Sequence, residues 1–91
     1  MNYVYILTNK NKTVLYTGVT SNLEQRIAQH KSKSFGGFTA KYNVDRLIYF
    51  EEFQSIEQAI EREKQIKGMT RNRKEALISE SNPEWDEIAM R

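Results

Sequence analysis

The sequence predicts an α+β fold in which a three-stranded antiparallel sheet is flanked by helices, in the order ββαβαα. Three short segments are rich in β-branched and aromatic residues, which is typical of strands. Two of them are followed by helix-capping patterns and then by apolar residues at helical spacing. Because 91 residues make one small domain, we expect the strands to pair in one sheet with helices on its faces.

The first two strands are predicted at residues 3–7 and 13–19. Their sequences, YVYIL and TVLYTGV, are separated by the stretch TNKNK, whose asparagine and lysine residues suit a turn. These segments therefore favour a β-hairpin. The third strand is expected over residues 46–53, RLIYFEEF, whose first residues are apolar on both faces.

The first helix is predicted at residues 22–32. Ser21 stands three positions before Glu24, which is the spacing of a capping box, and apolar residues then recur at helical intervals. Residues 33–44, KSFGGFTAKYNV, contain paired glycines and show no clear period, so they are expected to form a loop. Loops of this kind often contact ligands.

Two further helices are expected in the second half of the chain. Ser55 and Gln58 form a second capping-box pattern ahead of a helix at residues 56–68. A third helix is predicted over residues 70–79, where Thr70 is a residue type that caps helix N-termini. These helices complete the ββαβαα order.

The composition indicates one domain over residues 1–82, followed by a C-terminal tail or short helix over residues 83–91. The chain has no cysteine, which excludes a disulfide framework and a thiolate metal site. Its apolar runs are much shorter than the ~20 residues that span a bilayer, and its first residues do not resemble a signal peptide. We therefore expect a cytoplasmic protein that does not act at a membrane.

Charge is distributed unevenly along the chain. Residues 10–46 carry seven Lys and Arg against two acidic residues, and residues 62–74 carry six against one, so each block has a net charge of +5. Residues 47–61 and 75–91 each have a net charge of −4. Such blocks could form a basic face that binds a phosphate backbone, although on charge alone a solvated surface of mixed charge is the simpler explanation.

Glu63 is a carboxylate where the pattern of its helix favours an apolar residue. With Ile56 at zero on a helical wheel, Ile60 lies at about +40° and Glu63 at about −20°, inside the apolar stripe. An unpaired buried carboxylate is costly, so Glu63 is expected to be paired, protonated, at the edge of a cleft or bound to a metal ion. Lys67, one turn later, is the simplest structural partner.

Polar residues also gather around the second strand and the helix that follows it. Arg26 and His30 are one helical turn apart, on or beside the face that meets the sheet. Tyr16 and Gly18 share one face of the second strand, and Tyr5 lies on the strand expected to pair with it. Taken singly, ordinary aromatic packing and a satisfied core histidine explain these residues, whereas together they suggest a site.

The combination resembles the GIY-YIG nuclease domain, and in particular its small stand-alone members. The two half-motifs correspond to VYI at residues 4–6 and YTG at residues 16–18, in which valine and threonine replace the glycine and isoleucine that name the motif. Arg26 and His30 stand where the family has its helix arginine and its His or Tyr. Glu63 falls at the position of the family's single metal-binding glutamate. The resemblance covers nearly the whole chain.

The resemblance implies an endonuclease that hydrolyses phosphodiester bonds of a nucleic acid, most simply DNA. Glu63 would hold a single Mg²⁺ or Mn²⁺, and Arg26 would pair with the phosphate that is cut. Tyr5 or Tyr16 would act as the general base or orient the water. His30 would form a hydrogen bond to a tyrosine or to the phosphate. These five residues are the expected catalytic set.

Substrate binding is expected from Gly18, which leaves room for a ligand, and from four basic side chains, Lys31, Lys41, Lys67 and Arg71. The resemblance is compatible with a role in DNA repair or recombination. A separate protein partner could supply specificity or turnover, because a fold and a motif alone do not establish activity.

Two alternatives remain open at this point. The chain could bind nucleic acid without cutting it, through the basic residues 31–41 and 62–74 and the aromatic side chains of Phe35, Phe38 and Tyr42. It could also be a protein-interaction domain in which the glutamate–lysine pair is only structural and the single tryptophan is an anchor or a core residue.

Overall fold

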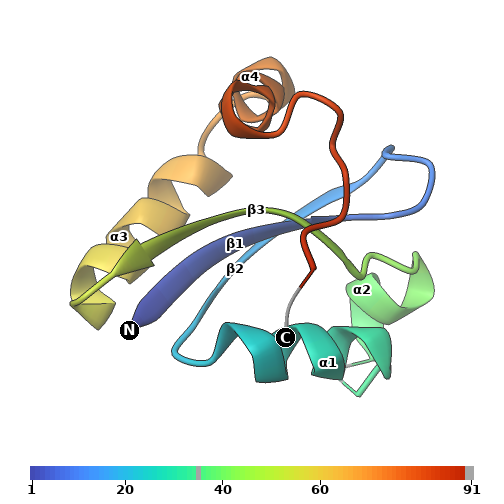
Figure 1. Cartoon of the computed structure of the whole chain (residues 1–91), viewed down its shortest axis with the longest axis horizontal. Coiled ribbons are helices and arrows are strands. Elements are labelled where there is room, and N and C mark those ends of the chain that lie inside the picture. The colour runs from blue at the N-terminus through green and yellow to red at the C-terminus, as the bar shows by residue number, and fades with distance from the viewer. Residues whose placement is uncertain (35, 90–91) are drawn as a thin grey trace.

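The computed structural model describes residues 1–34 and 36–89, which form the predicted three-stranded antiparallel sheet with helices on both faces (Figure 1). The strand order is β2-β1-β3, so the first strand is central. No helix in the described ranges is long and apolar enough to cross a membrane. The elements are β1 Asn2–Thr8, β2 Leu15–Thr20, α1 Leu23–Lys31, α2 Gly37–Lys41, β3 Arg46–Phe53, α3 Ile56–Lys67 and α4 Arg71–Ser81.

The sheet separates two hydrophobic cores because successive residues of β1 point to opposite faces. Val4 and Ile6 pack against residues of α3 and α4, whereas Tyr5 and Leu7 face α1. Figure 1 shows α1 and α2 on one side of the sheet and α3 and α4 on the other. Each fully buried aliphatic side chain contributes about 1.5–3 kcal/mol. Both faces of the central strand are therefore buried in a hydrophobic core.

The region expected to be a loop contains a short helix, α2, which the sequence analysis missed. Gly36 and Gly37 both have φ of +61°, a left-handed conformation that suits glycine and brings the chain into the helix. Within α2, Thr39 is buried, and its carbonyl accepts a hydrogen bond of 2.9 Å from the amide of Val44. Contacts with the rest of the fold, rather than a capping pattern, therefore hold this helix. Phe35 lies outside the described residues.

The helix starts agree with the predicted caps at two of three positions. Ser55 accepts a hydrogen bond from the amide of Gln58, and Thr70 accepts one from the third residue of α4. At α1 the prediction was wrong by one residue, because the side chain of Asn22, not Ser21, accepts the capping bond from Gln25. Asparagine is as good a cap as serine, so either residue could have served.

The predicted apolar stripe of α3 was also wrong in its orientation. Ile56 and Ile60 are each 38% exposed, while Ala59 and Ile66 are fully buried. The small side chain of Ala59 lets the helix approach the sheet, and this contact turns the two isoleucines outward. Glu63 lies at the flank of the buried face, and its side chain is 16% exposed.

The C-terminal segment, residues 83–89, crosses the outer edge of β3 from the α4 side of the sheet to the α1 side (Figure 1). The amide of Ile88 donates a hydrogen bond of 2.8 Å to the carbonyl of Leu47. At the start of the crossing, the side-chain amide of Asn82 donates to the carbonyl of Ile48 at 2.9 Å. The segment is thus fastened to the sheet at two points.

Replacing Asn82 with alanine is expected to lower the free energy of unfolding by about 1–2 kcal/mol, because its amide also bonds Asp86 on the crossing segment. Denaturant titration measures the change. The neighbouring Ser81→Ala is the control, since the Ser81 hydroxyl makes only a 3.5 Å contact with the carbonyl of Ile78. Equal stabilities for the two variants would contradict a fastening role for Asn82.

Candidate active site

Four of the five residues expected to be catalytic gather on the α1 side of the sheet. Tyr5 and Tyr16 come from the paired strands β1 and β2, and Arg26 and His30 come from one side of α1. The rings of Tyr5 and Tyr16 have centroids 6.3 Å apart, and the imidazole of His30 lies 5.8 Å from the first and 5.5 Å from the second. The three rings therefore form one contact cluster.

Gly18 makes this cluster possible. It lies directly opposite Tyr5 in the antiparallel register of β1 and β2. A Cβ atom at Gly18 would lie 2.5 Å from both Cζ and the hydroxyl oxygen of Tyr5, closer than real Cβ atoms approach other atoms. The tyrosine ring thus crosses β2 through space that only glycine leaves.

A chain of hydrogen bonds links the strands to both helices on this side. The hydroxyl of Tyr5 and Nε2 of His30 are 3.0 Å apart, and Nδ1 of His30 lies 3.3 Å from the hydroxyl of Thr39 on α2. Arg26 adds a side-chain hydrogen bond to Tyr5. If Arg26 donates to the tyrosine oxygen, the tyrosine hydroxyl can donate to Nε2, and the Nδ1 proton can go to Thr39.

Burial raises the pKa of Tyr5 to about 12, and the neighbouring Tyr16 acts in the same direction. Arg26 opposes this rise through its charge and its hydrogen bond, while the negative charge of Glu63 adds to it. In the state that the structure shows, Tyr5 is therefore a neutral phenol at physiological pH. Arg26 is the group best placed to favour its ionised form.

Burial also lowers the pKa of His30 from its ordinary value of 6.5. The positive charge of Arg26 lowers it further, and the carboxylate of Asp45 partly offsets both effects. His30 is accordingly a neutral imidazole at neutral pH, able to accept a hydrogen bond at one nitrogen and donate one at the other.

The lowered pKa of His30 predicts a pH dependence of stability. Because the fold favours the neutral ring, the unfolded chain binds a proton first, and stability is lost as the pH falls below about 6.5. His30→Gln should show a shallower loss between pH 7 and pH 5 in denaturant titrations. Glu51, a second group with a shifted pKa, titrates below this pH range. Burial acts to raise its pKa, but hydrogen bonds from Arg62 and Tyr49 hold the pKa below 4.5. Identical slopes for parent and variant would contradict the prediction.

A small open pocket lies beside the ring cluster and has a volume of about 170 Å³. It is bordered by the second tyrosine and the polar residues of α1, and α2 forms its opposite wall. A phosphate group that enters it would meet the guanidinium of Arg26 and the phenol of Tyr16, donor types that stabilise an oxyanion. Both ring nitrogens of His30 are already engaged by Tyr5 and Thr39. The lining residues are Tyr16, Arg26, His30, Gly36, Phe38 and Thr39.

Glu63 stands apart from this pocket lining. It lies on α3, which packs on the other face of the sheet but also contacts β2, the edge strand nearest the ring cluster. Its carboxylate is 3.4 Å from the ammonium of Lys67 and near enough to Tyr5 to influence its pKa. Among residues 1–34 and 36–89, no three His, Cys, Asp or Glu side chains gather where they could share a metal ion. A lone carboxylate fits Mg²⁺ or Mn²⁺ held mainly by water and substrate.

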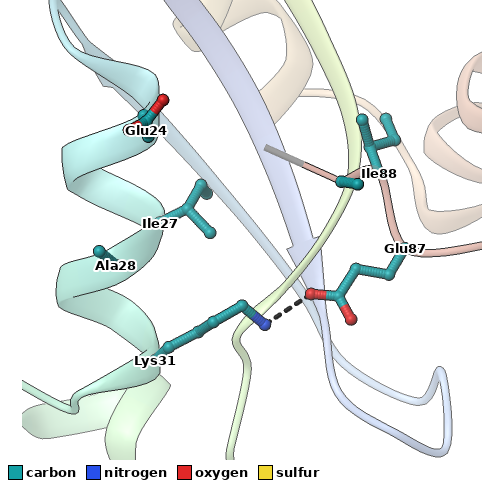
Figure 2. A pocket seen from close by; sticks show the side chains of 7 residues that line it. Glu24, Ile27, Ala28, Lys31, Glu87 and Ile88 are labelled. Atoms are coloured by element: carbon teal, nitrogen blue, oxygen red, sulfur yellow. Dashed lines mark hydrogen bonds and ion pairs between the residues drawn. The ribbon is translucent and has the colours of Figure 1, made fainter. Parts of the chain in front are cut away.

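The four basic residues expected to bind substrate are spread over the molecule. Lys41 lies on α2, next to the pocket wall. Figure 2 shows Lys31 pointing from α1 toward Glu87 of the C-terminal segment, with which it forms a 2.5 Å ion pair. Arg71 donates to two carbonyls of the β1–β2 turn, and Lys67 pairs with the glutamate of α3. Lys31 and Lys41 thus both lie on helices that border the pocket, but Lys31 is engaged by Glu87.

Comparison with known proteins identifies the family of this chain. Residues 1–76 match the family model described as the GIY-YIG catalytic domain. The chain belongs to the GIY-YIG family. Within this family it is similar to UPF0213 proteins, including CPE1444 of Clostridium perfringens, which is 47% identical over 87% of this chain and 84% of the relative. A UPF0213 protein of Syntrophus aciditrophicus is 45% identical over 91% and 94% of the two chains.

The fold is also shared with a solved structure from the same group. The solution NMR structure of the UPF0213 protein BH0048 from Bacillus halodurans matches 94% of this chain and 92% of its own, with a TM-score of 0.60 and 34% identity. This likeness confirms the α+β fold of a small GIY-YIG domain. The tyrosine, arginine and histidine positions that suggested the family occupy one side of one sheet.

Thr39 and the placement of Phe38 are the parts of this GIY-YIG site that sequence reasoning missed. Both belong to α2, which has no side-chain capping bond, follows Gly36 and begins with Gly37. The available signal was the GFTAKY stretch, in which two aromatic residues stand four positions apart, one helical turn. That spacing was overlooked because paired glycines usually indicate a loop.

Proposed function

We propose that this GIY-YIG domain is a metal-dependent endonuclease that hydrolyses phosphodiester bonds in nucleic acid, with DNA as the substrate. The observation that carries the proposal is the hydrogen-bonded chain from Arg26 through Tyr5 and His30 to Thr39, beside an open pocket. A satisfied buried network fixes its members in one geometry, which is what a reaction with a charged transition state requires.

Arg26 is assigned to the phosphate that is cut. Its guanidinium borders the pocket and presents a planar, permanently charged set of donors, which suits phosphate oxygens. Charge that develops on these oxygens in the transition state would strengthen the contact. His30 is held neutral between two hydroxyl groups and is assigned to orient Tyr5 while remaining at the pocket wall.

The two tyrosines differ in access to the substrate. Tyr5 has no exposed surface, whereas Tyr16 is partly exposed and borders the pocket. We assign Tyr16 to contact with the attacking water or the phosphate. Tyr5, whose pKa is about 12, is a poor base in this state and is assigned to hold Arg26 and His30 in position.

Glu63 is assigned to the divalent cation. A bound Mg²⁺ or Mn²⁺ ion would supply positive charge that stabilises the oxygen leaving the phosphate. The ammonium of Lys67 is the present counter-charge of this carboxylate. The side chain of Lys67 is 54% exposed, so the ammonium can move away into solvent without disrupting the fold. The DNA structures that are cut would indicate whether the protein acts in repair or recombination. They would also indicate whether it needs a partner protein for specificity.

The test is a cleavage panel of duplex, single-stranded, flap and junction DNA and matching RNA, with Mg²⁺ and Mn²⁺. The parent should cut at least one substrate, and Glu63→Gln should lower the rate at least about 100-fold. Glu61→Gln is the matched control, since that glutamate is exposed on the same helix. A folded parent that binds these substrates but cuts none with either metal would overturn the nuclease proposal and favour a binding module.

A further inference from the structure

Helix α2 and the residue that caps its C-terminus, Tyr42, carry two aromatic rings that the fold only partly buries. Phe38 is 49% exposed and Tyr42 is 45% exposed, and neither belongs to the two core clusters. Their ring centroids are 5.0 Å apart and the planes meet at 53°, so outer ring faces remain open to solvent. The ammonium of Lys41 lies 5.4 Å from the centroid of the Tyr42 ring.

Thr39 attaches α2 to the rest of the protein. It lies between the two aromatic residues in the sequence, is buried, and bonds both His30 and the amide of Val44. Two adjacent exposed rings beside a positive charge therefore indicate a ligand, since neighbouring exposed apolar side chains often mark a binding surface.

The position of the rings relates them to the proposed site. Phe38 borders the same small pocket as Arg26 and Tyr16. A nucleotide whose phosphate contacts Arg26 would therefore have its sugar and base beside α2. The nearby Lys41 can offset the charge of the adjoining phosphate.

We propose that Phe38, Tyr42 and Lys41 form a subsite that stacks one unpaired base next to the phosphate to be cut. This inference rests on the proposed function and narrows it to single-stranded or locally unpaired nucleic acid. Aromatic rings stack on any exposed base, so the subsite tolerates different sequences. A base inside a duplex already stacks on its neighbours and would first have to leave the helix, at a cost.

Binding without divalent metal tests the subsite separately from cleavage. Fluorescence anisotropy in EDTA would compare a labelled single-stranded DNA with the duplex of the same sequence. Phe38→Ala and Tyr42→Ala should each weaken single-strand binding by about 5- to 100-fold and leave duplex binding within about 2-fold. Phe38→Leu keeps an apolar side chain without a stacking face and should lose nearly as much. Ile60→Ala, on the exposed face of α3, is the matched control and should bind like the parent.

Strands that lack a single base test whether one particular base contacts the Phe38 ring. Moving a single abasic nucleotide along the strand should reveal one position that weakens binding to the parent but has little further effect on Phe38→Ala. Full single-strand affinity in the aromatic variants, or equal losses on single strand and duplex, would overturn the subsite. If the parent cuts DNA and these variants cut single strands at the parental rate, the subsite fails while the proposed function stands. If the parent cuts nothing but the abasic coupling is present, the nuclease proposal fails and the stacking surface stands.

Discussion

Replacing Gly18 with alanine is expected to lower cleavage at least about 100-fold. The added Cβ would lie 2.5 Å from Cζ and the hydroxyl of Tyr5, so either the ring or the strand must move. Movement of the ring breaks its 3.0 Å hydrogen bond with His30 and displaces the contact with Arg26. Misplacement by about 1 Å is enough for a loss of this size. Overpacking should also lower the free energy of unfolding by about 1–3 kcal/mol.

Gly68→Ala is the matched control for that experiment. A Cβ atom there would lie 3.5 Å from the carbonyl of Lys64, an ordinary contact, so stability and cleavage should stay close to the parental values. Steady-state kinetics and denaturant titration of both variants provide the comparison. Parental activity in a folded Gly18→Ala protein would show that the position of Tyr5 does not matter for the reaction.

Replacing Arg26 with alanine is expected to lower kcat by about 10²- to 10³-fold, because the phosphate loses its only guanidinium among the residues that line the pocket. Arg26→Lys should recover only part of the loss, since an ammonium lacks the planar pair of donors. Arg73→Ala, an exposed arginine on α4, is the control and should retain activity. A kcat of Arg26→Ala within a few-fold of the parental value would show that Arg26 has no part in the mechanism.

The same variant has a readout that does not depend on cleavage. The charge of Arg26 contributes to the lowered pKa of His30, so its removal should raise that pKa toward 6.5. The chain has one histidine, and its imidazole proton signals can therefore be followed by NMR without ambiguity. An unchanged titration would mean that Arg26 does not act on the ring cluster.

Much of the fold and part of the site could be predicted from short-range periodicity. Alternation along a strand placed Tyr16 and Gly18 on one face, and the helical period placed Arg26 and His30 one turn apart; the structure has both. These predictions succeeded because each depends on residues within one element. The functional roles of these residues remain predictions.

The remaining features depend on contacts between distant parts of the chain. Helix α2 is held through Thr39 by a histidine nine positions away, and Lys31 finds its partner 56 positions later in Glu87. The rotation of α3 places Ala59 and Ile66 against the sheet and leaves Ile56 and Ile60 partly exposed. No local pattern encodes such contacts.

The crossing of the C-terminal segment over β3 has a consequence for how copies of the molecule behave toward one another. An uncovered edge strand offers free backbone groups to which another chain can add a strand, the usual route to aggregation. Here the carbonyls of Leu47 and Ile48 are already engaged by Ile88 and Asn82. Residues 82–88 thus block the addition of another strand at this part of β3.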